Sequence, residues 1–308
     1  MVQRSIQAPS AVVIIRPRHF SPNAETAIDN AFQQDASGQE KSALELSAYA
    51  EVGDVVKALE AVGIHTHVFE DEGRETPDSV FPNNWFSTHP GGHVAMYPMF
   101  AQSRRKERRA DVIEMLKREY RVQDVVDYSG LEADGLFLEG TGAMVLDHVD
   151  RVAYAARSNR TDPIALERFC THFNYEPMVF DACDERGKAV YHTNVLMCIA
   201  TEFAMIGLDM IADAPRRNHI VQRLQDSGRE IIGLSHRQIA EFAGNAIELQ
   251  GREGRVLALS ARALHSLYPD QRAKIEKHVR PLPLNVETIE MAGGSVRCML
   301  AGIHLAKR

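Results

Sequence analysis

The chain has 308 residues, of which 44% are hydrophobic and 25% are charged, and its formal net charge is −7. This composition is typical of a globular protein that can bury a large core without disulfides or a structural metal. The acidic balance argues against nucleic-acid binding, which usually requires a basic excess. The sequence has no run of about 18 apolar residues that could cross a membrane.

The first ten residues lack the apolar core of a signal peptide. The four cysteines, at positions 170, 183, 198 and 298, include no C-x-x-C pair, which argues against a zinc or redox motif. We therefore expect a cytoplasmic protein with reduced thiols. Cys170, Cys183 and Cys198 have an ordinary explanation as small buried apolar residues.

The N-terminal part predicts an extended run at 11–17, a helix at 42–62 and a strand at 65–70. Four later segments each contain two apolar runs around a polar or glycine-bearing turn, which indicates a β-hairpin. They are 84–98, 141–158, 194–209 and 245–260.

Each hairpin is followed by a segment with helical periodicity, at 104–120, 162–174, 214–227 and 261–279. In the first of these, Val112, Ile113, Leu116 and Tyr120 fall on one face. Asp162 is the expected N-cap of the second, because a proline follows it at the first helical position. A short extended run follows each helix, at 122–128, 176–180, 229–235 and 283–290.

The repeating unit is therefore strand–strand–helix–strand, and its starts at 84, 141, 194 and 245 are 57, 53 and 51 residues apart. A further step of this length reaches Cys298, in the apolar run 297–305. The N-terminal elements supply the missing parts of a fifth unit. Five units closed by both chain ends would leave no free sheet edge. An open doubly wound sheet is the alternative α/β fold, but it does not explain a hairpin before every helix.

Unusual polar residues recur at the start of the first strand of successive units. If the units are related by rotation, these residues converge near one axis. They are Asn84, Glu139, Thr141, His192, Asn194, Asn245 and Cys298. Each alone has a structural explanation, such as a cap or a buried thiol. Their common position in the repeat instead favours a site in which a cysteine attacks carbon and a histidine transfers protons.

Five motifs resemble the pentein superfamily, which includes arginine deiminase, dimethylarginine hydrolase and the amidinotransferases. They are FPNNWF (81–86), LEGTG (138–142), ARSNRT (156–161), YHTN (191–194) and GGSVRCM (293–299). With the N-terminal segment 16–33 included, the chain most resembles the citrulline-utilisation hydrolases of the CtlX type. The resemblance implies one catalytic domain over 1–308 with the fold of a fivefold α/β propeller.

The resemblance also implies Cys298 as nucleophile, His192 as general acid and base, and Glu139 as its carboxylate partner. It implies that Arg160 clamps the α-carboxylate of an amino-acid substrate, since arginine binds carboxylates bidentately. A solvated surface charge is the alternative for Arg160. We expect Asn245 to contribute to substrate binding.

The chain departs from the arginine deiminases at two positions. Those enzymes carry aspartates, which hold a guanidinium cation, where this chain has Asn84 and Asn194. A buried guanidinium without carboxylates is disfavoured. A neutral ureido group has one carbonyl and several N–H groups, which suit an amide that both donates and accepts. We therefore expect Asn84 and Asn194 to bind a ureido substrate.

Two further features are interpreted structurally. The basic run 104–109 is expected to form a solvated helix face rather than an anion-binding patch. His65 and His67 alternate on a strand, but no carboxylate or cysteine has matching spacing, so no metal is assigned.

The leading hypothesis is hydrolysis of citrulline to ornithine, carbon dioxide and ammonia, with no cofactor. The alternatives are a deiminase or amidinotransferase acting on arginine and, more remotely, a non-enzymatic binding factor with the same ring. The expected partner is a small amino-acid substrate, with no nucleic acid or membrane. The sequence leaves the oligomeric state open, a homo-oligomer included.

Overall fold

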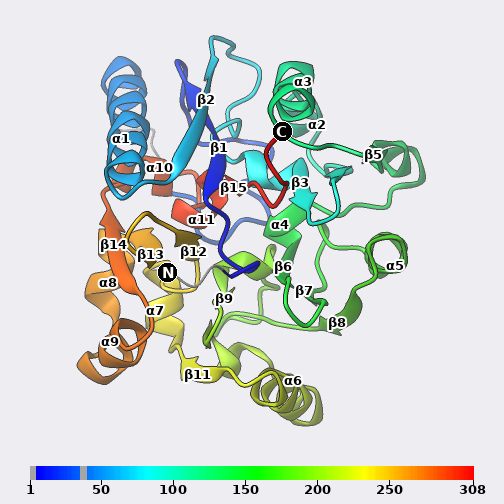
Figure 1. Cartoon of the computed structure of the whole chain (residues 1–308), viewed down its shortest axis with the longest axis vertical. Coiled ribbons are helices and arrows are strands. Elements are labelled where there is room, and N and C mark those ends of the chain that lie inside the picture. The colour runs from blue at the N-terminus through cyan, green and yellow to red at the C-terminus, as the bar shows by residue number, and fades with distance from the viewer. Residues whose placement is uncertain (1–4, 35–39) are drawn as a thin grey trace.

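The computed structural model describes residues 5–34 and 40–308. Its strands form five three-stranded sheets of one pattern, arranged around a common centre with helices on the rim (Figure 1). In each sheet the middle strand pairs antiparallel with one neighbour and parallel with the other. The predicted five-unit α/β fold is confirmed.

Four sheets begin with the predicted hairpins. These are β3 (Phe86–His89) with β4 (His93–Met96), β6 (Met144–Asp147) with β7 (Val152–Ala156), β9 (Met197–Ile199) with β10 (Phe203–Ile206), and β12 (Ile247–Gln250) with β13 (Arg255–Ser260). The parallel third strands are β5 (Asp124–Asp127), β8 (Glu176–Phe180), β11 (Glu230–Gly233) and β14 (Arg280–Leu284). Each parallel pair requires a crossover connection, usually a helix, because a tight hairpin joins only antiparallel strands.

Those connecting helices cover the outside of the ring. They are α2 (Gln102–Arg105) and α3 (Ala110–Glu119), α5 (Pro163–Phe173), α6 (Ala214–Asp226), and α8 (Ala261–Ser266) and α9 (Pro269–Glu276). The predicted apolar face of α3 is buried. The predicted N-cap of α5 is also present, since the Asp162 side chain accepts hydrogen bonds from Ile164 N and Ala165 N. A short helix, α7 (His236–Ala240), follows β11.

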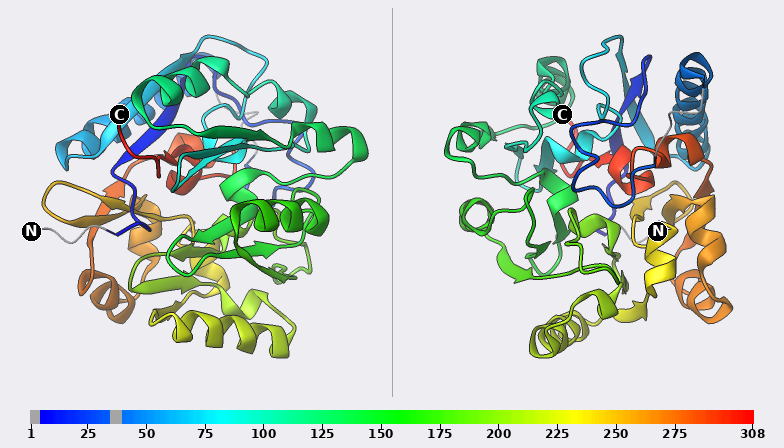
Figure 2. Two further views of the ribbon diagram at one scale, coloured as in Figure 1. Left: turned by 45° about the vertical axis from the view of Figure 1, so that its right-hand side comes forward. Right: turned by 180° about the vertical axis from the view of Figure 1, so that it is seen from behind.

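The fifth sheet is assembled from both ends of the chain. Strand β1 (Ala11–Pro17) pairs in parallel with β2 (His65–Asp71), across helix α1 (Lys41–Ala61). It also pairs antiparallel with β15 (Ala301–Gly302), with Val12 opposite Gly302. Both views in Figure 2 show the C-terminal segment inside the ring beside β1. The N- and C-terminal segments therefore close the ring together.

One element prediction in the C-terminal part is wrong. The run 283–290 was expected to be extended, but the strand ends at Leu284 and Glu287–Glu290 forms helix α10. Cys298 lies in the single-turn helix α11 (Val296–Met299), directly before β15, which is the expected place at the entry to the first strand of its unit. Helix α10 is fixed by Glu51 on α1, whose carboxylate accepts hydrogen bonds from the backbone of Thr288 and Ile289. This contact comes from the opposite end of the chain.

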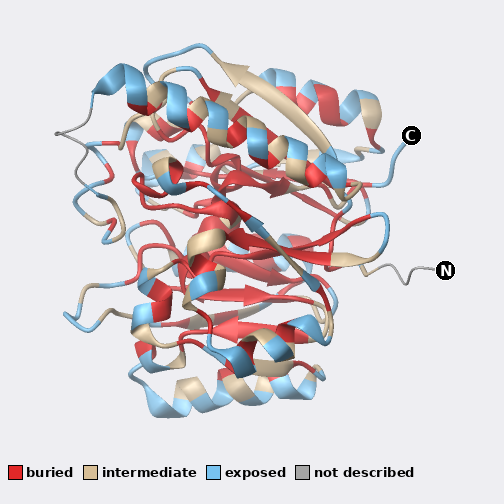
Figure 3. Ribbon diagram, turned by 90° about the vertical axis from the view of Figure 1, so that its left-hand side faces the viewer, coloured by how far each residue is buried: buried red, intermediate tan, exposed pale blue. Residues whose placement is uncertain are grey.

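The core lies between the sheets and beneath the helices, as the buried interior in Figure 3 shows. The helices expose only their outer faces (Figure 3). Among the described residues, no helix is long and apolar enough to cross a bilayer.

Candidate active site

The predicted site residues, apart from Arg160, which follows β7, lie on short turns that precede the first strands of their units. Asn84 ends the single-turn helix η1 (Pro82–Asn84), and Glu139 precedes the short helix α4 (Gly140–Ala143). His192 precedes the turn η3 (Thr193–Val195), which contains Asn194. These turns contact one another at the centre of the ring. The seven residues to which the sequence assigns a catalytic or binding role are all buried, each with 3% or less of its surface exposed: Asn84, Glu139, Arg160, His192, Asn194, Asn245 and Cys298.

The Cys298 sulfur is held by two side-chain amides. Asn194 Nδ2 and Asn245 Nδ2 each lie 3.2 Å from Sγ and donate to it. Asn245 Oδ1 in turn accepts from the backbone N–H of Arg297 at 3.0 Å, which fixes the direction of the amide. Hydrogen-bond donors to sulfur stabilise the negative charge of a thiolate. The arrangement therefore suits a nucleophilic cysteine.

His192 and Glu139 form a buried pair. His192 Nε2 lies 2.9 Å from Glu139 Oε2, and the backbone N–H of Phe100 donates to Oε1 at 3.0 Å. Burial raises the pKa of Glu139, but Arg160, the His192 hydrogen bond and Arg104 together lower it to about 2. Burial lowers the pKa of His192 to about 4 despite the nearby carboxylate. An ionised carboxylate only accepts, so Nε2–H donates to it and Nδ1 is left as the base.

Two glycines in LEGTG allow the turns to approach closely. A Cβ atom on Gly142 would lie 2.2 Å from Asn84 Nδ2 and 2.7 Å from His192 Nδ1. Gly140 has φ of +47°, and a Cβ there would lie 2.5 Å from the Asn83 carbonyl oxygen. Asn84 Nδ2 and His192 Nδ1 are thus both close to the α-carbon of Gly142. The Asn84 amide and the basic nitrogen of His192 therefore face one region of the site.

The two asparagines at the deiminase aspartate positions are oriented by fixed partners. Asn84 Oδ1 accepts from Arg104 Nη1 at 2.8 Å, and arginine has no acceptor, so the oxygen must face it. Asn84 Nδ2 is buried and has no partner among the described residues. Asn194 is reversed: its Nδ2 faces the Cys298 sulfur, and its buried Oδ1 has no partner in the described part of the chain. These two asparagines therefore offer one free donor and one free acceptor.

The basic run contributes a residue to this site, contrary to the expectation of a solvated face. Arg104 is 2% exposed and Glu107 is 3% exposed. The two form a bidentate ion pair with both N–O distances at 2.9 Å. Arg104 also lies 3.7 Å from Asp78 and 3.5 Å from Glu139. Burial raises the pKa of Glu107 to about 8, although Arg104 opposes that rise.

Arg160 is buried and already paired with a carboxylate of its own chain. Its Nε donates to Asp29 Oδ2 at 2.9 Å, and Nη2 bonds to the other oxygen of Asp29. Its Nη1 lies 3.6 Å from Glu139, and the guanidinium lies 4.9 Å from the centre of the Tyr191 ring. The solvated alternative is therefore wrong, and the role of substrate clamp stays a prediction.

Sequence reasoning missed Asp29, Asp78, Arg104 and Glu107. Asp29 lies in the segment 16–33, which carries part of the resemblance, but no chemical pattern singled it out. Arg104 and Glu107 are three residues apart, a spacing that occurs on any charged helix. No signal in the sequence separated this pair from its solvated neighbours.

A cavity of about 360 Å³ borders the site at Tyr191. Phe32 and Phe242 lie on its walls, and Asp184 and Arg262 supply charge. The ring of Tyr191 packs against His192, with the two ring centres 4.7 Å apart. Tyr191 therefore contacts both the cavity and the imidazole of His192.

Comparison of structures identifies proteins with the same fold. The N-terminal domain of ArgZ, described as an arginine dihydrolase from the ornithine–ammonia cycle in cyanobacteria, superposes with a TM-score of 0.73 at 15% identity, over 95% of this chain and 97% of that chain. A dimethylarginine dimethylaminohydrolase variant bound as an adduct with S-methyl-L-thiocitrulline gives a TM-score of 0.66 at 15% identity, over 96% and 100% of the two chains. AgrE in a ternary complex with ornithine and NAD⁺ gives a TM-score of 0.74 at 16% identity. The match covers 97% of this chain and 40% of the AgrE chain. At these identities the likeness shows the fold.

No curated protein sequence matches the chain. The sequence profile described as N,N dimethylarginine dimethylhydrolase, eukaryotic, matches residues 16–305. That match spans nearly the whole chain, and it agrees with the five-sheet fold. The protein therefore belongs to the N,N-dimethylarginine dimethylhydrolase family of the pentein superfamily.

Proposed function

We propose that the protein is a cysteine-dependent hydrolase that cleaves the ureido group of citrulline to give ornithine, carbon dioxide and ammonia. The observation that carries the proposal is the orientation of Asn84. Arg104 engages the amide oxygen, and the buried Nδ2 is left as a free donor. A ureido carbonyl accepts hydrogen bonds, whereas a guanidinium has donors only.

Asn194 complements this donor. Its free Oδ1 accepts, which suits an N–H group of the ureido nitrogen, and its Nδ2 faces the sulfur. One donor and one acceptor thus match the two polar sides of a ureido group. A guanidinium would place its N–H groups against the Asn84 donor, and an unmatched buried donor costs about 1–3 kcal/mol.

The proposed reaction begins when His192 Nδ1 takes the proton of the Cys298 thiol and the sulfur attacks the ureido carbon. The sulfur–carbon bond forms, and the carbonyl π electrons move to the oxygen, which accepts from Asn84. The oxyanion collapses and one carbon–nitrogen bond breaks, while protonated His192 gives its proton to the departing amine. The order in which ammonia and the δ-amine leave stays open.

Water completes the proposed cycle. His192 Nδ1 accepts a proton from water, which attacks the carbonyl of the sulfur-bound intermediate, and the carbon–sulfur bond breaks. The released carbamate decomposes to carbon dioxide and an amine. Glu139 holds His192 in the tautomer that leaves Nδ1 unprotonated.

At the amino-acid end, we propose that the substrate α-carboxylate takes the position of the Asp29 carboxylate on Arg160. The bidentate contact with Asp29 supports this proposal, because it shows that the guanidinium edge has the geometry that a carboxylate requires. Asp29 is less buried than Arg160, with 16% against 2% of the side chain exposed.

A guanidino substrate is the second candidate, and the charge of the site favours it. Four carboxylates, from Asp29, Asp78, Glu107 and Glu139, surround the two arginines of the cluster. An excess of carboxylates attracts a cation. The bidentate pair with Arg104 offsets the charge of Glu107, which reduces that excess.

The test is incubation of the purified protein with citrulline, arginine and a methylated arginine in parallel. Ornithine, citrulline and ammonia are measured in each reaction. The proposal predicts ornithine and ammonia from citrulline. Turnover of arginine or methylarginine without turnover of citrulline would contradict it, and the Cys298→Ser variant serves as the inactive control.

A further inference from the structure

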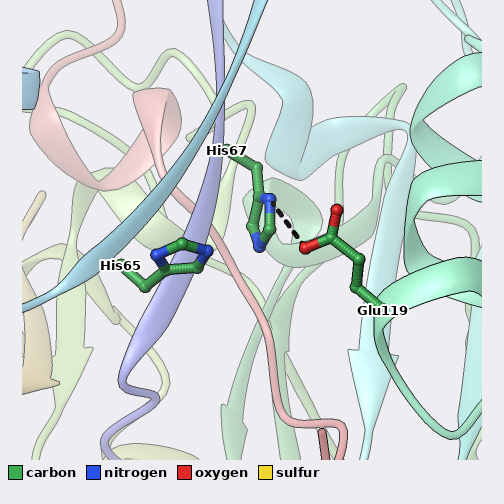
Figure 4. Close-up of side chains that lie close together, drawn as sticks. All are labelled: His65, His67 and Glu119. Atoms are coloured by element: carbon green, nitrogen blue, oxygen red, sulfur yellow. Dashed lines mark ion pairs between the residues drawn. The ribbon is translucent and has the colours of Figure 1, made fainter. Parts of the chain in front are cut away.

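Two histidines and one glutamate lie together outside the active site (Figure 4). His65 and His67 are two residues apart on β2, so their side chains project from the same face of the strand. Glu119 is the last residue of α3. One ligand atom from each residue lies within 4.8 Å of the other two. No carboxylate lies near the two histidines in the sequence, but the fold brings the Glu119 carboxylate beside them.

The orientation of His67 and Glu119 leaves one ring nitrogen and one carboxylate oxygen facing each other. His67 Nε2 is 2.7 Å from the Tyr120 hydroxyl, so that ring nitrogen already has a partner. His67 Nδ1 lies 3.8 Å from Glu119 Oε2, which is too long for a hydrogen bond. Glu119 Oε1 is engaged by Arg118 at 2.9 Å, so Oε2 is the carboxylate oxygen that remains beside the imidazole.

This arrangement resembles the ligands of a metal ion together with the groups that orient those ligands. A ligating histidine usually has its other ring nitrogen hydrogen-bonded, which fixes the ring, and Tyr120 does this for His67. The His65 ring packs edge-on against the His67 ring, with ring centres 4.4 Å apart. Ligand atoms on a tetrahedral zinc ion are about 3.4 Å apart, so side-chain rotation would have to shorten the longest separation by about 1.4 Å.

We propose that His65, His67 and Glu119 bind one divalent transition-metal ion of the zinc class, with water in the fourth position. Two imidazoles and one carboxylate favour Zn²⁺, Ni²⁺ or Cu²⁺ over Mg²⁺ or Ca²⁺, which prefer all-oxygen ligands.

The position of the cluster suggests what the ion would do. Strand β2 belongs to the sheet assembled from both chain ends, and α3 belongs to the next unit along the ring. Tyr120, directly after Glu119, also bridges to Lys307 at the C-terminus. An ion at this place would join the closing unit to its neighbour. Its role would be structural, and the reaction at Cys298 would not require it.

The first experiment is a titration with Co²⁺, whose visible absorption reports its coordination. The protein is used in its metal-stripped form and as the Cys298→Ser variant, because the active-site thiol is itself a possible ligand. The proposal predicts about one bound ion per chain. The variants His65→Ala, His67→Ala and Glu119→Gln should each lose that spectrum.

The second experiment measures thermal unfolding with and without Zn²⁺. With free Zn²⁺ at about 100 times its Kd, the folded-to-unfolded ratio should rise about 100-fold. The matched control is His93→Ala, which removes a half-exposed histidine that pairs with Asp124 in the neighbouring sheet. This control should keep both the cobalt spectrum and the Zn²⁺ shift.

Absence of a cobalt spectrum in the parent chain would overturn the proposal. So would a spectrum or a Zn²⁺ shift that survives in all three ligand variants, because the ion would then sit elsewhere.

Discussion

Asn84→Asp changes one atom at the point where the proposed function is decided. The new carboxylate oxygen would replace Nδ2, while the other oxygen keeps the 2.8 Å contact with Arg104. The fold should therefore persist, since an arginine partner compensates the new charge. The substrate carbonyl, however, would lose its donor and face a second oxygen.

The structure sets the size of the effect. A buried carbonyl left without its donor costs about 1–3 kcal/mol. Since about 1.36 kcal/mol of activation free energy corresponds to a tenfold change in rate, kcat/KM for citrulline should fall by roughly 5- to 150-fold. The new carboxylate accepts N–H groups, so the preference for citrulline over arginine should fall by at least the same factor.

The assay is the measurement of kcat/KM for citrulline and arginine on the parent and variant proteins, by ornithine and ammonia release. Asn159→Asp is the matched control, because it makes the same chemical change at an exposed position beside Arg160. It should change neither rate constant much. Full citrulline activity in Asn84→Asp would refute the assigned role of the amide donor.

Four further predictions follow from the contacts of the site. Gly142→Ala should lower the free energy of unfolding by about 1–3 kcal/mol and abolish turnover. Gly130→Ala, whose new Cβ meets no atom within 4 Å, should leave both unchanged, and denaturant unfolding measures the difference in stability. The acid limb of kcat/KM should lie near pH 4, because burial keeps His192 neutral down to its lowered pKa; a midpoint near 6.5 would contradict the assignment. Arg104→Met should cost about 3–5 kcal/mol of stability, because buried carboxylates lose their partner; an unchanged unfolding midpoint would argue against that role. Alkylation followed by peptide mapping should modify Cys298 before the other thiols, and this preference should disappear in a His192→Ala variant.

The fold was predictable because its repeat is visible in the periodicity of the chain. Four hairpins and four helical segments recur at nearly constant spacing, and strand β1 was placed within its observed limits. The region around Glu287 was not predictable, because helix α10 depends on a carboxylate from Glu51 on α1. A contact between the two ends of the chain leaves no mark in the local pattern.

The site was predictable only in part, for a related reason. Residues at the start of each first strand converge by the symmetry of the ring, so a repeat was enough to group them. Arg104 and Glu107 come from a helical connection, where a buried ion pair and a solvated pair have the same sequence. The free donor on Asn84 depends on that arginine, so the strongest argument about the substrate needed the structure.

The most direct test of the central claim is peptide mapping of the protein after rapid acid quench with citrulline labelled at the ureido carbon. The account predicts that the label is found on the peptide that contains Cys298, and that it disappears from this peptide as labelled carbon dioxide is released. The mass of the adduct would also show which amine leaves first. Turnover of citrulline with no label on Cys298 at any quench time would contradict the account.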